Sequence, residues 1–218
     1  MSRGGRPYIV AIAGGSASGK TSFALYLQAA LGSAHATIVT EDSYYLPSWA
    51  RPPGDMATYN FDRPETKDFD LLISHLRLAE RGEAFACPRY DFATHERLDE
   101  THHIAPARVL IVEGLHNLGF DDIRSIADLT IFIEAHVDLR RSRRIARDVA
   151  ERGRTHDDTA RQFDAVVEPM HVAHVEPQKP LATRVIVNAG AMAALKDEAL
   201  TLAREIEAAL APGGNSAH

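Results

Sequence analysis

Short apolar runs alternate with segments of helical periodicity along most of the chain. Five of the runs each predict a buried strand, at residues 8–13, 36–40, 108–114, 128–134 and 185–187. Apolar residues recur at helical spacing in the longer segments between and after them, for example at 68–81 and 191–210. This alternation predicts an α/β domain built on a parallel sheet.

The alternation is interrupted between about residues 46 and 106. The first part of this region, residues 46–64, carries four prolines and little periodicity, which predicts an ordered loop that crosses the functional site. Residues 84–92 and 97–104 predict two short strands. We therefore expect a small β-ribbon inserted on the sheet, not a separate domain.

Composition limits the class of protein. With 218 residues and 45% apolar residues, the chain can bury a substantial core, and one domain over residues 1–218 is the simplest organisation, with a disordered tail at about 211–218. The net charge of −6 argues against a nucleic-acid or membrane partner. A single cysteine, Cys87, excludes an internal disulfide, and no run approaches the roughly 18 apolar residues of a spanning helix. We expect a cytoplasmic protein.

The clearest motif follows the first predicted strand directly. It reads Gly14-Gly15-Ser16-Ala17-Ser18-Gly19-Lys20-Thr21 and fits the phosphate-loop pattern G-x-x-x-x-G-K-[ST]. Glycines let the backbone turn its N–H groups inward, the next helix points its positive end at the same place, and Lys20 adds a mobile cation. Thr21 offers a hydroxyl to Mg²⁺. The motif predicts a phosphate site; the alternative is a glycine-rich turn.

Two predicted strands deliver acidic residues to the edge where open parallel sheets bind ligands. The strand at 36–40 leads into Glu41-Asp42-Ser43-Tyr44-Tyr45, and the strand at 108–114 carries Glu113 near its end. Phosphate-loop enzymes place an acidic residue there that reaches Mg²⁺ through water. A solvated strand end is the alternative for Glu113.

The segment at about residues 140–162 is strongly basic, with eight arginines and no lysine. Arg140, Arg144 and Arg147 share one helical face, an arrangement that suits phosphoryl oxygens. Ordinary surface ion pairs are the alternative. Gly153 permits a hinge, so we expect this segment to form a lid over a nucleotide.

In their order and spacing, these motifs resemble the uridine kinase (uridine-cytidine kinase) branch of the phosphoribulokinase/uridine kinase family of P-loop kinases. The matching segments are residues 14–21, 41–45, 60–62, 90–92 with 95 and 97, 113–114, 143–144 with 147–148, 151–154, and 169–171 with 175–177. The resemblance implies a doubly wound parallel sheet with helices on both faces, an inserted β-ribbon and an Arg-rich lid.

The same resemblance implies an activity. The γ-phosphoryl group of ATP or GTP would be transferred to the 5′-hydroxyl of uridine or cytidine, with Mg²⁺, in pyrimidine salvage. The only partner implied is the small-molecule nucleoside, and the family suggests a homotetramer.

Residue roles follow from the resemblance as well. Asp42 would hold and deprotonate the 5′-hydroxyl; Thr21, Glu113 and Asp42 would serve Mg²⁺. Lys20 and Arg147 would assist catalysis, and Arg147 and Arg152 would face the phosphates. The residues implied for the nucleoside are Asp62 and Arg144 at the ribose hydroxyls, Phe61 and Phe92 beside it, and Tyr90, His95, Arg154 and Gln162 around the pyrimidine.

The chain departs from the family pattern at Arg63, where a histidine is usual, and at Lys67, where an aromatic residue is usual. Both cations would suit an anionic acceptor, so a related kinase of a phosphorylated pentose, as in phosphoribulokinase, or of pantothenate is the alternative function. Tyr90, Phe92 and His95 favour a ring-bearing acceptor instead.

Two readings outside small-molecule kinases are disfavoured. A GTPase switch should carry an Asn-Lys-x-Asp segment, and none is present. An inactive nucleotide-binding scaffold would not need Lys20, Thr21, Asp42 and Glu113 together.

Residues 179–183 also differ from the family pattern, and no contact to the nucleotide base can be assigned after them.

Overall fold

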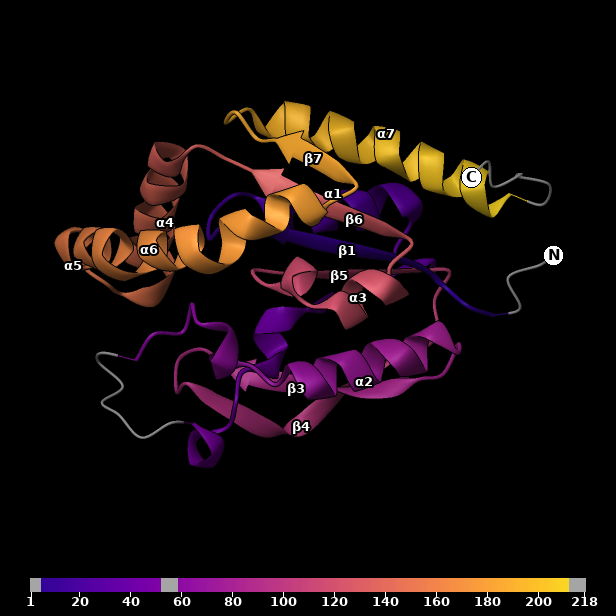
Figure 1. The fold of residues 1–218 in the computed structure, drawn as a ribbon, viewed down its shortest axis with the longest axis horizontal. Helices are drawn as coiled ribbons and strands as arrows, with labels where there is room; N and C mark the ends of the chain where they lie inside the picture. Colours follow the sequence, from indigo (N-terminus) through magenta and orange to yellow (C-terminus); the bar gives the residue numbers. More distant parts are fainter. Residues whose placement is uncertain (1–4, 52–58, 212–218) are drawn as a thin grey trace.

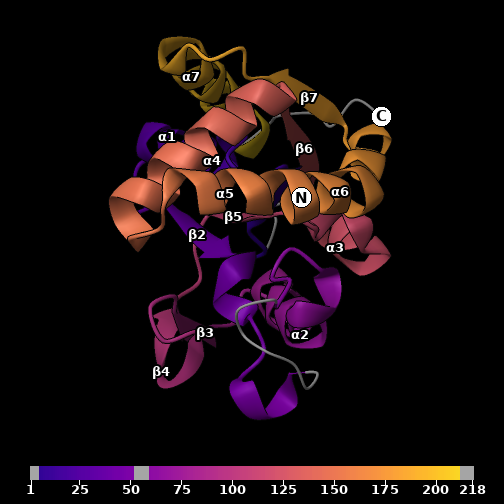
Figure 2. The ribbon, with the colours of Figure 1, turned by 90° about the vertical axis from the view of Figure 1, so that its left-hand side faces the viewer.

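Five parallel strands form the central sheet in the order β2-β5-β1-β6-β7; Figure 1 labels all of them except β2, which is labelled in Figure 2. In chain order they are β1 (Tyr8–Gly14), β2 (Ala36–Thr40), β5 (Val109–Gly114), β6 (Leu129–Glu134) and β7 (Arg184–Val187). The computed structural model describes residues 5–51 and 59–211. The five apolar runs are confirmed as strands. They are nearly continuous in apolar residues because helices cover both faces of the sheet.

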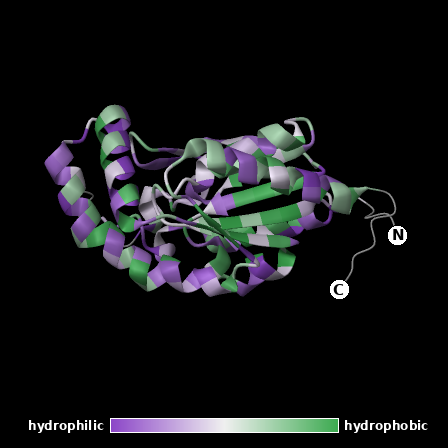
Figure 3. Ribbon diagram, turned by 90° about the horizontal axis from the view of Figure 1, so that it is seen from above, coloured by the Kyte–Doolittle hydropathy of each residue, from purple (hydrophilic) through white to green (hydrophobic). Residues whose placement is uncertain are grey.

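Two helical layers enclose this sheet. On one face, α1 (Lys20–Leu31) packs against α7 (Met192–Leu210), and both bury apolar side chains over β1 and β6. On the other face lie α2 (Phe69–Glu80) and α3 (Asp121–Ile126). Figure 3 shows the most hydrophobic colour on the central strands, between helices of mixed colour. The doubly wound α/β fold is confirmed.

Helix α3 is absent from the sequence prediction. It has six residues and buries only Ile123 and Ile126, so its apolar pattern is too short to stand out. None of the helices in residues 5–51 and 59–211 combines the length and apolarity needed to cross a bilayer.

The inserted region contains a separate antiparallel pair, β3 (Phe85–Asp91) and β4 (Glu96–Ile104). This pair is the predicted ribbon, and it contacts the short 3₁₀ helix at Glu41–Tyr44 that follows β2. Residues 52–58 of the predicted crossing loop lie outside the described residues, as does the predicted tail except for Ala211.

The basic segment forms α4 (Val137–Arg152), which ends at Gly153 in a left-handed conformation with φ 64°. After it, α5 (His156–Gln162) begins at His156, because the Thr155 side chain caps it by accepting a hydrogen bond from Asp158 N. The helical path continues through α6 (Glu168–Met170) to Val175. Figure 2 shows α4 and α5 side by side across one end of the molecule.

Candidate active site

The phosphate loop joins β1 to α1 through strained backbone. Ala17 and Gly19 have φ values of 61° and 99°. A side chain at Gly19 would place its Cβ 2.5 Å from Asn188 Nδ2, the same atom that donates to Ser18 O at 2.7 Å. Asn188, which follows β7, therefore braces the loop. It is absent from the predicted site because no pattern near the loop points to a residue 170 positions away.

Two side chains with oxygen ligands suited to Mg²⁺ lie close together, one at the start of α1 and one near the end of β5. The Thr21 hydroxyl donates to Glu113 Oε2 at 3.2 Å, and Glu113 is buried in the strand next to β1. Burial raises the pKa of Glu113, and Lys20 opposes that shift. The described residues hold no group of three or more His, Cys, Asp or Glu that could bind a metal. One carboxylate and a hydroxyl still fit Mg²⁺, which keeps waters and takes phosphate oxygens as further ligands.

Asp42 lies in the turn that follows β2. Its N–H donates to the Thr40 hydroxyl at 3.3 Å, and its carboxylate accepts from Lys67 Nζ at 2.8 Å. Loss of solvation raises the pKa of Asp42, but Lys67 and Lys20 outweigh this and lower it to about 2. The Asp42 side chain keeps 41% of its surface exposed and lines the pocket described next, so a charged carboxylate faces that pocket.

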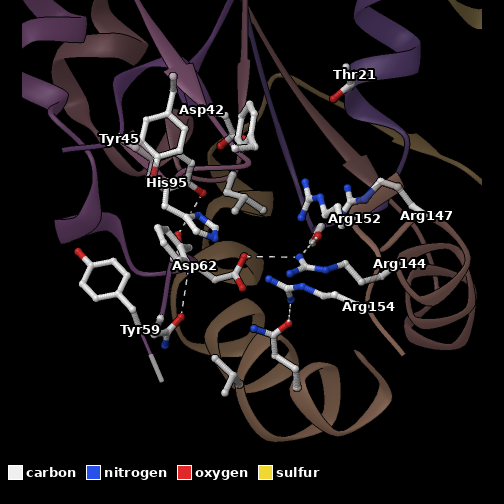
Figure 4. A pocket seen from close by; sticks show the side chains of 18 of the residues that line it. Thr21, Asp42, Tyr45, Tyr59, Asp62, His95, Arg144, Arg147, Arg152 and Arg154 are labelled. Carbon is white, nitrogen blue, oxygen red and sulfur yellow. Dashed lines mark hydrogen bonds and ion pairs between the residues drawn. The ribbon is translucent and has the colours of Figure 1, made fainter. Parts of the chain in front are cut away.

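One pocket runs from the phosphate loop to the inserted ribbon (Figure 4). Every residue that the sequence assigns to the nucleoside lines it, together with Lys20, Thr21, Asp42, Arg147 and Arg152. Tyr45, Leu115 and Val166 also line it and are absent from the predicted site. The glycines of the loop and Glu113 lie outside the lining. The structure thus brings the residues predicted for the nucleoside together in one pocket, although their individual roles stay predictions.

Aromatic rings form the wall of the pocket on the side of the inserted ribbon. Phe61 stacks on His95 with centroids 4.9 Å apart, and Tyr45 packs against Tyr90 at 4.9 Å. Burial and the nearby Arg154 and Arg51 lower the pKa of His95, so its imidazole is neutral near pH 7. This wall suits a neutral ring that stacks and forms hydrogen bonds.

Arginines form the opposite wall around a single buried carboxylate, Asp148. Ion pairs join Asp148 to Arg144 at 3.0 Å, Arg147 at 2.9 Å, Arg152 at 3.5 Å and Arg154 at 3.9 Å. Burial alone would raise the pKa of Asp148, but these arginines lower it below its usual range. Asp148 is missing from the predicted site because its neighbours in the sequence make it look like one half of a surface pair.

Arg144 connects this cluster to both ends of the pocket. Its Nη1 donates to Ser16 Oγ in the phosphate loop at 2.7 Å and lies 3.9 Å from Asp62 Oδ1. In Figure 4, Asp62 lies between the arginines on one side and His95 on the other.

Arg140 does not line this pocket with Arg144 and Arg147, although the three arginines share one helical face. Arg140 belongs to the first turn of α4, where it is buried against a different segment and pairs with Glu168 at 2.7 Å. It lines a separate pocket with His171. Helical spacing correctly places the three arginines on one face of α4. It does not indicate that Glu168 pairs with the arginine in the first turn.

The two cations that depart from the family pattern do not supply free positive charge to the pocket. Arg63 is exposed and does not line it. Lys67 is buried, and its ammonium is paired with Glu41 and Asp42. The argument for an anionic acceptor therefore loses its basis.

A parallel sheet with a phosphate loop, an acidic residue on the adjacent strand and an arginine-lined pocket wall defines a P-loop kinase of small molecules. The chain belongs to the Phosphoribulokinase / Uridine kinase family, whose sequence profile matches residues 9–195.

Relatives agree with that family, and solved structures agree with the fold. The chain is 38% identical to the uridine kinase of Brevibacillus brevis over 186 residues, which cover 85% of this chain and 87% of that protein. It is 39% identical to the uridine kinase of Chloroflexus aggregans over 184 residues, or 84% and 88% of the two chains. In fold it is similar to the phosphoribulokinase from Rhodobacter spheroides, with a TM-score of 0.60, 19% identity and coverage of 86% and 73%. A possible uridine kinase from Bacillus stearothermophilus gives a TM-score of 0.58, 16% identity and coverage of 83% and 88%.

Proposed function

We propose that this protein transfers the γ-phosphoryl group of ATP to the 5′-hydroxyl of uridine or cytidine and releases the nucleoside monophosphate. The observation that supports this proposal is a single pocket, which extends from the phosphate loop to an aromatic and acidic wall that fits a nucleoside. Relatives that are 36–39% identical to this chain are uridine kinases. GTP is the alternative donor.

On the donor side, Lys20 and the loop N–H groups would hold the β- and γ-phosphates. Arg147 and Arg152, which line the same pocket, would neutralise charge on the transferring group. Mg²⁺, held by the Thr21 hydroxyl and by Glu113 through water, would supply further charge neutralisation at the phosphoryl oxygens. Phosphoryl transfer has a loose transition state, so alignment and charge neutralisation supply most of the rate enhancement.

On the acceptor side, Asp42 would orient the 5′-hydroxyl and take its proton. A carboxylate with a pKa of about 2 is a weak base towards an alcohol. It can nevertheless accept a hydrogen bond early and the proton late, when bond formation to phosphorus has made the hydroxyl acidic.

Ribose and base would be recognised by different walls. Asp62 and Arg144, which lie 3.9 Å apart, would contact the 2′- and 3′-hydroxyls. The neutral His95, together with Tyr90 and Gln162, would bind the polar edge of the pyrimidine. Because Lys67 is already paired, a phosphorylated pentose would find no free cation there.

An acceptor panel in a coupled ADP-release assay tests this function. Uridine, cytidine, their 2′-deoxy forms, ribulose 5-phosphate and pantothenate are each offered with ATP or GTP. We expect uridine or cytidine to give the highest kcat/KM. A higher kcat/KM for ribulose 5-phosphate or pantothenate would overturn the proposal.

We also propose a homotetramer, on family resemblance alone. Size-exclusion chromatography with light scattering measures the mass directly. A monomer at micromolar concentration would contradict the tetramer without bearing on the chemistry.

A further inference from the structure

Lys67 lies beneath the acceptor end of the pocket, with no exposed side-chain surface. Its ammonium donates to Glu41 Oε1 at 2.5 Å and to Asp42 Oδ1 at 2.8 Å, and it lies 4.7 Å from the centre of the Tyr45 ring. A lysine is almost never fully buried unless it is paired, and here it has two carboxylate partners.

The backbone holds Lys67 in this place. Residues 44–46 and 66–68 run antiparallel, with a bridge between Tyr45 and Lys67. On either side of the bridge, Leu46 N donates to Thr66 O at 2.9 Å and Asp68 N donates to Tyr44 O at 2.8 Å. The segment that carries Lys67 is thus tied to the turn that carries Asp42.

The two carboxylates differ in their surroundings. Glu41 is fully buried, and its Oε2 accepts from His116 N at 2.8 Å. It fills the space beside Gly114, where a Cβ would lie 2.1 Å from Glu41 Oε2. Asp42, in contrast, opens to the pocket. Lys67 therefore links a fixed buried anion to the anion that faces the acceptor.

Stability alone does not account for this arrangement. A buried ion pair often contributes no more than well-packed apolar side chains of similar volume. Two carboxylates on adjacent residues also repel each other, and a cation between them offsets that repulsion. The cation lies against Oδ1 of Asp42, so the orientation of that carboxylate depends on it.

We propose that Lys67 is a positioning residue for phosphoryl transfer, which holds Asp42 by Oδ1 so that the other carboxylate oxygen is presented to the acceptor hydroxyl. Glu41, which is paired with the same ammonium, in turn holds Lys67 in place. This inference rests on the proposed kinase function and on the role given there to Asp42. Lys67 does not line the pocket, so it acts through Asp42 and not on the nucleoside.

The first test is Lys67→Met in the full-length protein. We expect kcat for uridine to fall on the order of 10- to 100-fold, because a misplaced reacting group has an effect of that size. KM for uridine should change by less than about threefold. Lys179→Met is the matched control: it removes an ammonium 2.6 Å from Glu134 that does not line the pocket, and kcat should stay at the wild-type value.

A double-mutant cycle separates positioning from a general structural effect. If Lys67 acts through Asp42, adding Lys67→Met to an Asp42→Asn variant should lower kcat by less than about twofold further. Independent multiplication of the two losses would overturn the proposal, as would a Lys67→Met variant with wild-type kcat.

The single variant leaves Glu41 buried without its partner, so it can fail to fold. Glu41→Gln combined with Lys67→Met removes both charges and keeps the side chains similar in size. We expect this double variant to recover Tm but to keep a low kcat, because nothing then holds Asp42 Oδ1. Wild-type kcat in the folded double variant would refute the role of Lys67. If the wild-type protein prefers another alcohol in the acceptor panel, the same variants are measured with that alcohol, which keeps failure of the proposed function separate from failure of this inference.

Discussion

Arg144 donates from Nε to the fully buried carboxylate of Asp148 at 3.0 Å. Three further arginines lie within 4 Å of the same carboxylate, so Asp148 organises one wall of the pocket. Without it, a cluster of guanidinium groups would repel one another beside the phosphate loop.

Asp148→Asn should therefore lower both stability and activity. We expect the free energy of unfolding to fall by about 3 kcal/mol, since breaking a buried ion pair leaves uncompensated charge. Urea denaturation measures this. Asp164→Asn, which breaks the exposed pair with Arg141, is the control and should change the free energy of unfolding by less than about 1 kcal/mol. Equal effects of the two substitutions would show that Asp148 has no organising role.

Asp42→Asn should keep nucleoside binding and lose turnover. An amide preserves the shape of the side chain but cannot accept the proton, so kcat should fall by roughly 10²-fold or more. Steady-state kinetics give kcat, and calorimetric titration with uridine gives the binding constant. Near-native turnover would remove Asp42 from its proposed role.

The 2′-hydroxyl should contribute strongly to the choice of substrate. If Asp62 accepts a hydrogen bond from the ribose, 2′-deoxyuridine leaves that carboxylate without its partner, and kcat/KM should fall at least about 100-fold relative to uridine. Asp62→Ala should lose most of this discrimination. Similar kcat/KM values for the two nucleosides with the wild-type protein would argue against Asp62 as the ribose contact.

Stability should increase as the pH rises towards 7, partly because of His116. This imidazole is buried, its ring Nε2 lies 3.0 Å from Asp62 O, and burial lowers its pKa below the usual 6.5. The unfolded chain then binds a proton that the folded chain does not, so the stabilisation present above pH 6.5 is lost as the pH falls. His116→Gln should flatten the rise in the free energy of unfolding.

His75, His95 and His171 have pKa shifts in the same direction, so the comparison of wild-type protein with the variant isolates His116. Identical pH profiles would mean that His116 titrates alike in both states.

The fold is predictable from the sequence because its signals are local. A buried parallel strand is a run of adjacent apolar residues, and the phosphate loop is a run of eight adjacent residues. Helix α3 is too short to give such a signal. The candidate site is predictable where an acidic residue lies at or just after the end of a predicted strand, as Glu113 and Asp42 do.

The rest of the site depends on pairings between distant residues. Lys67 meets Glu41 across 26 positions, and nothing near Lys67 in the sequence indicates that its charge is already compensated. Arg140 and Arg144 are one turn apart on α4, yet different packing partners send their guanidinium groups to different pockets. Such choices follow from tertiary packing and not from spacing.

Asn188 holds Ser18 O from the far end of the chain. During synthesis, the phosphate loop leaves the ribosome early, whereas Asn188 emerges only after β7. The nascent chain therefore lacks a finished nucleotide site until nearly all of the domain has been made, and a truncation before Asn188 would remove donor binding even though the loop sequence is intact.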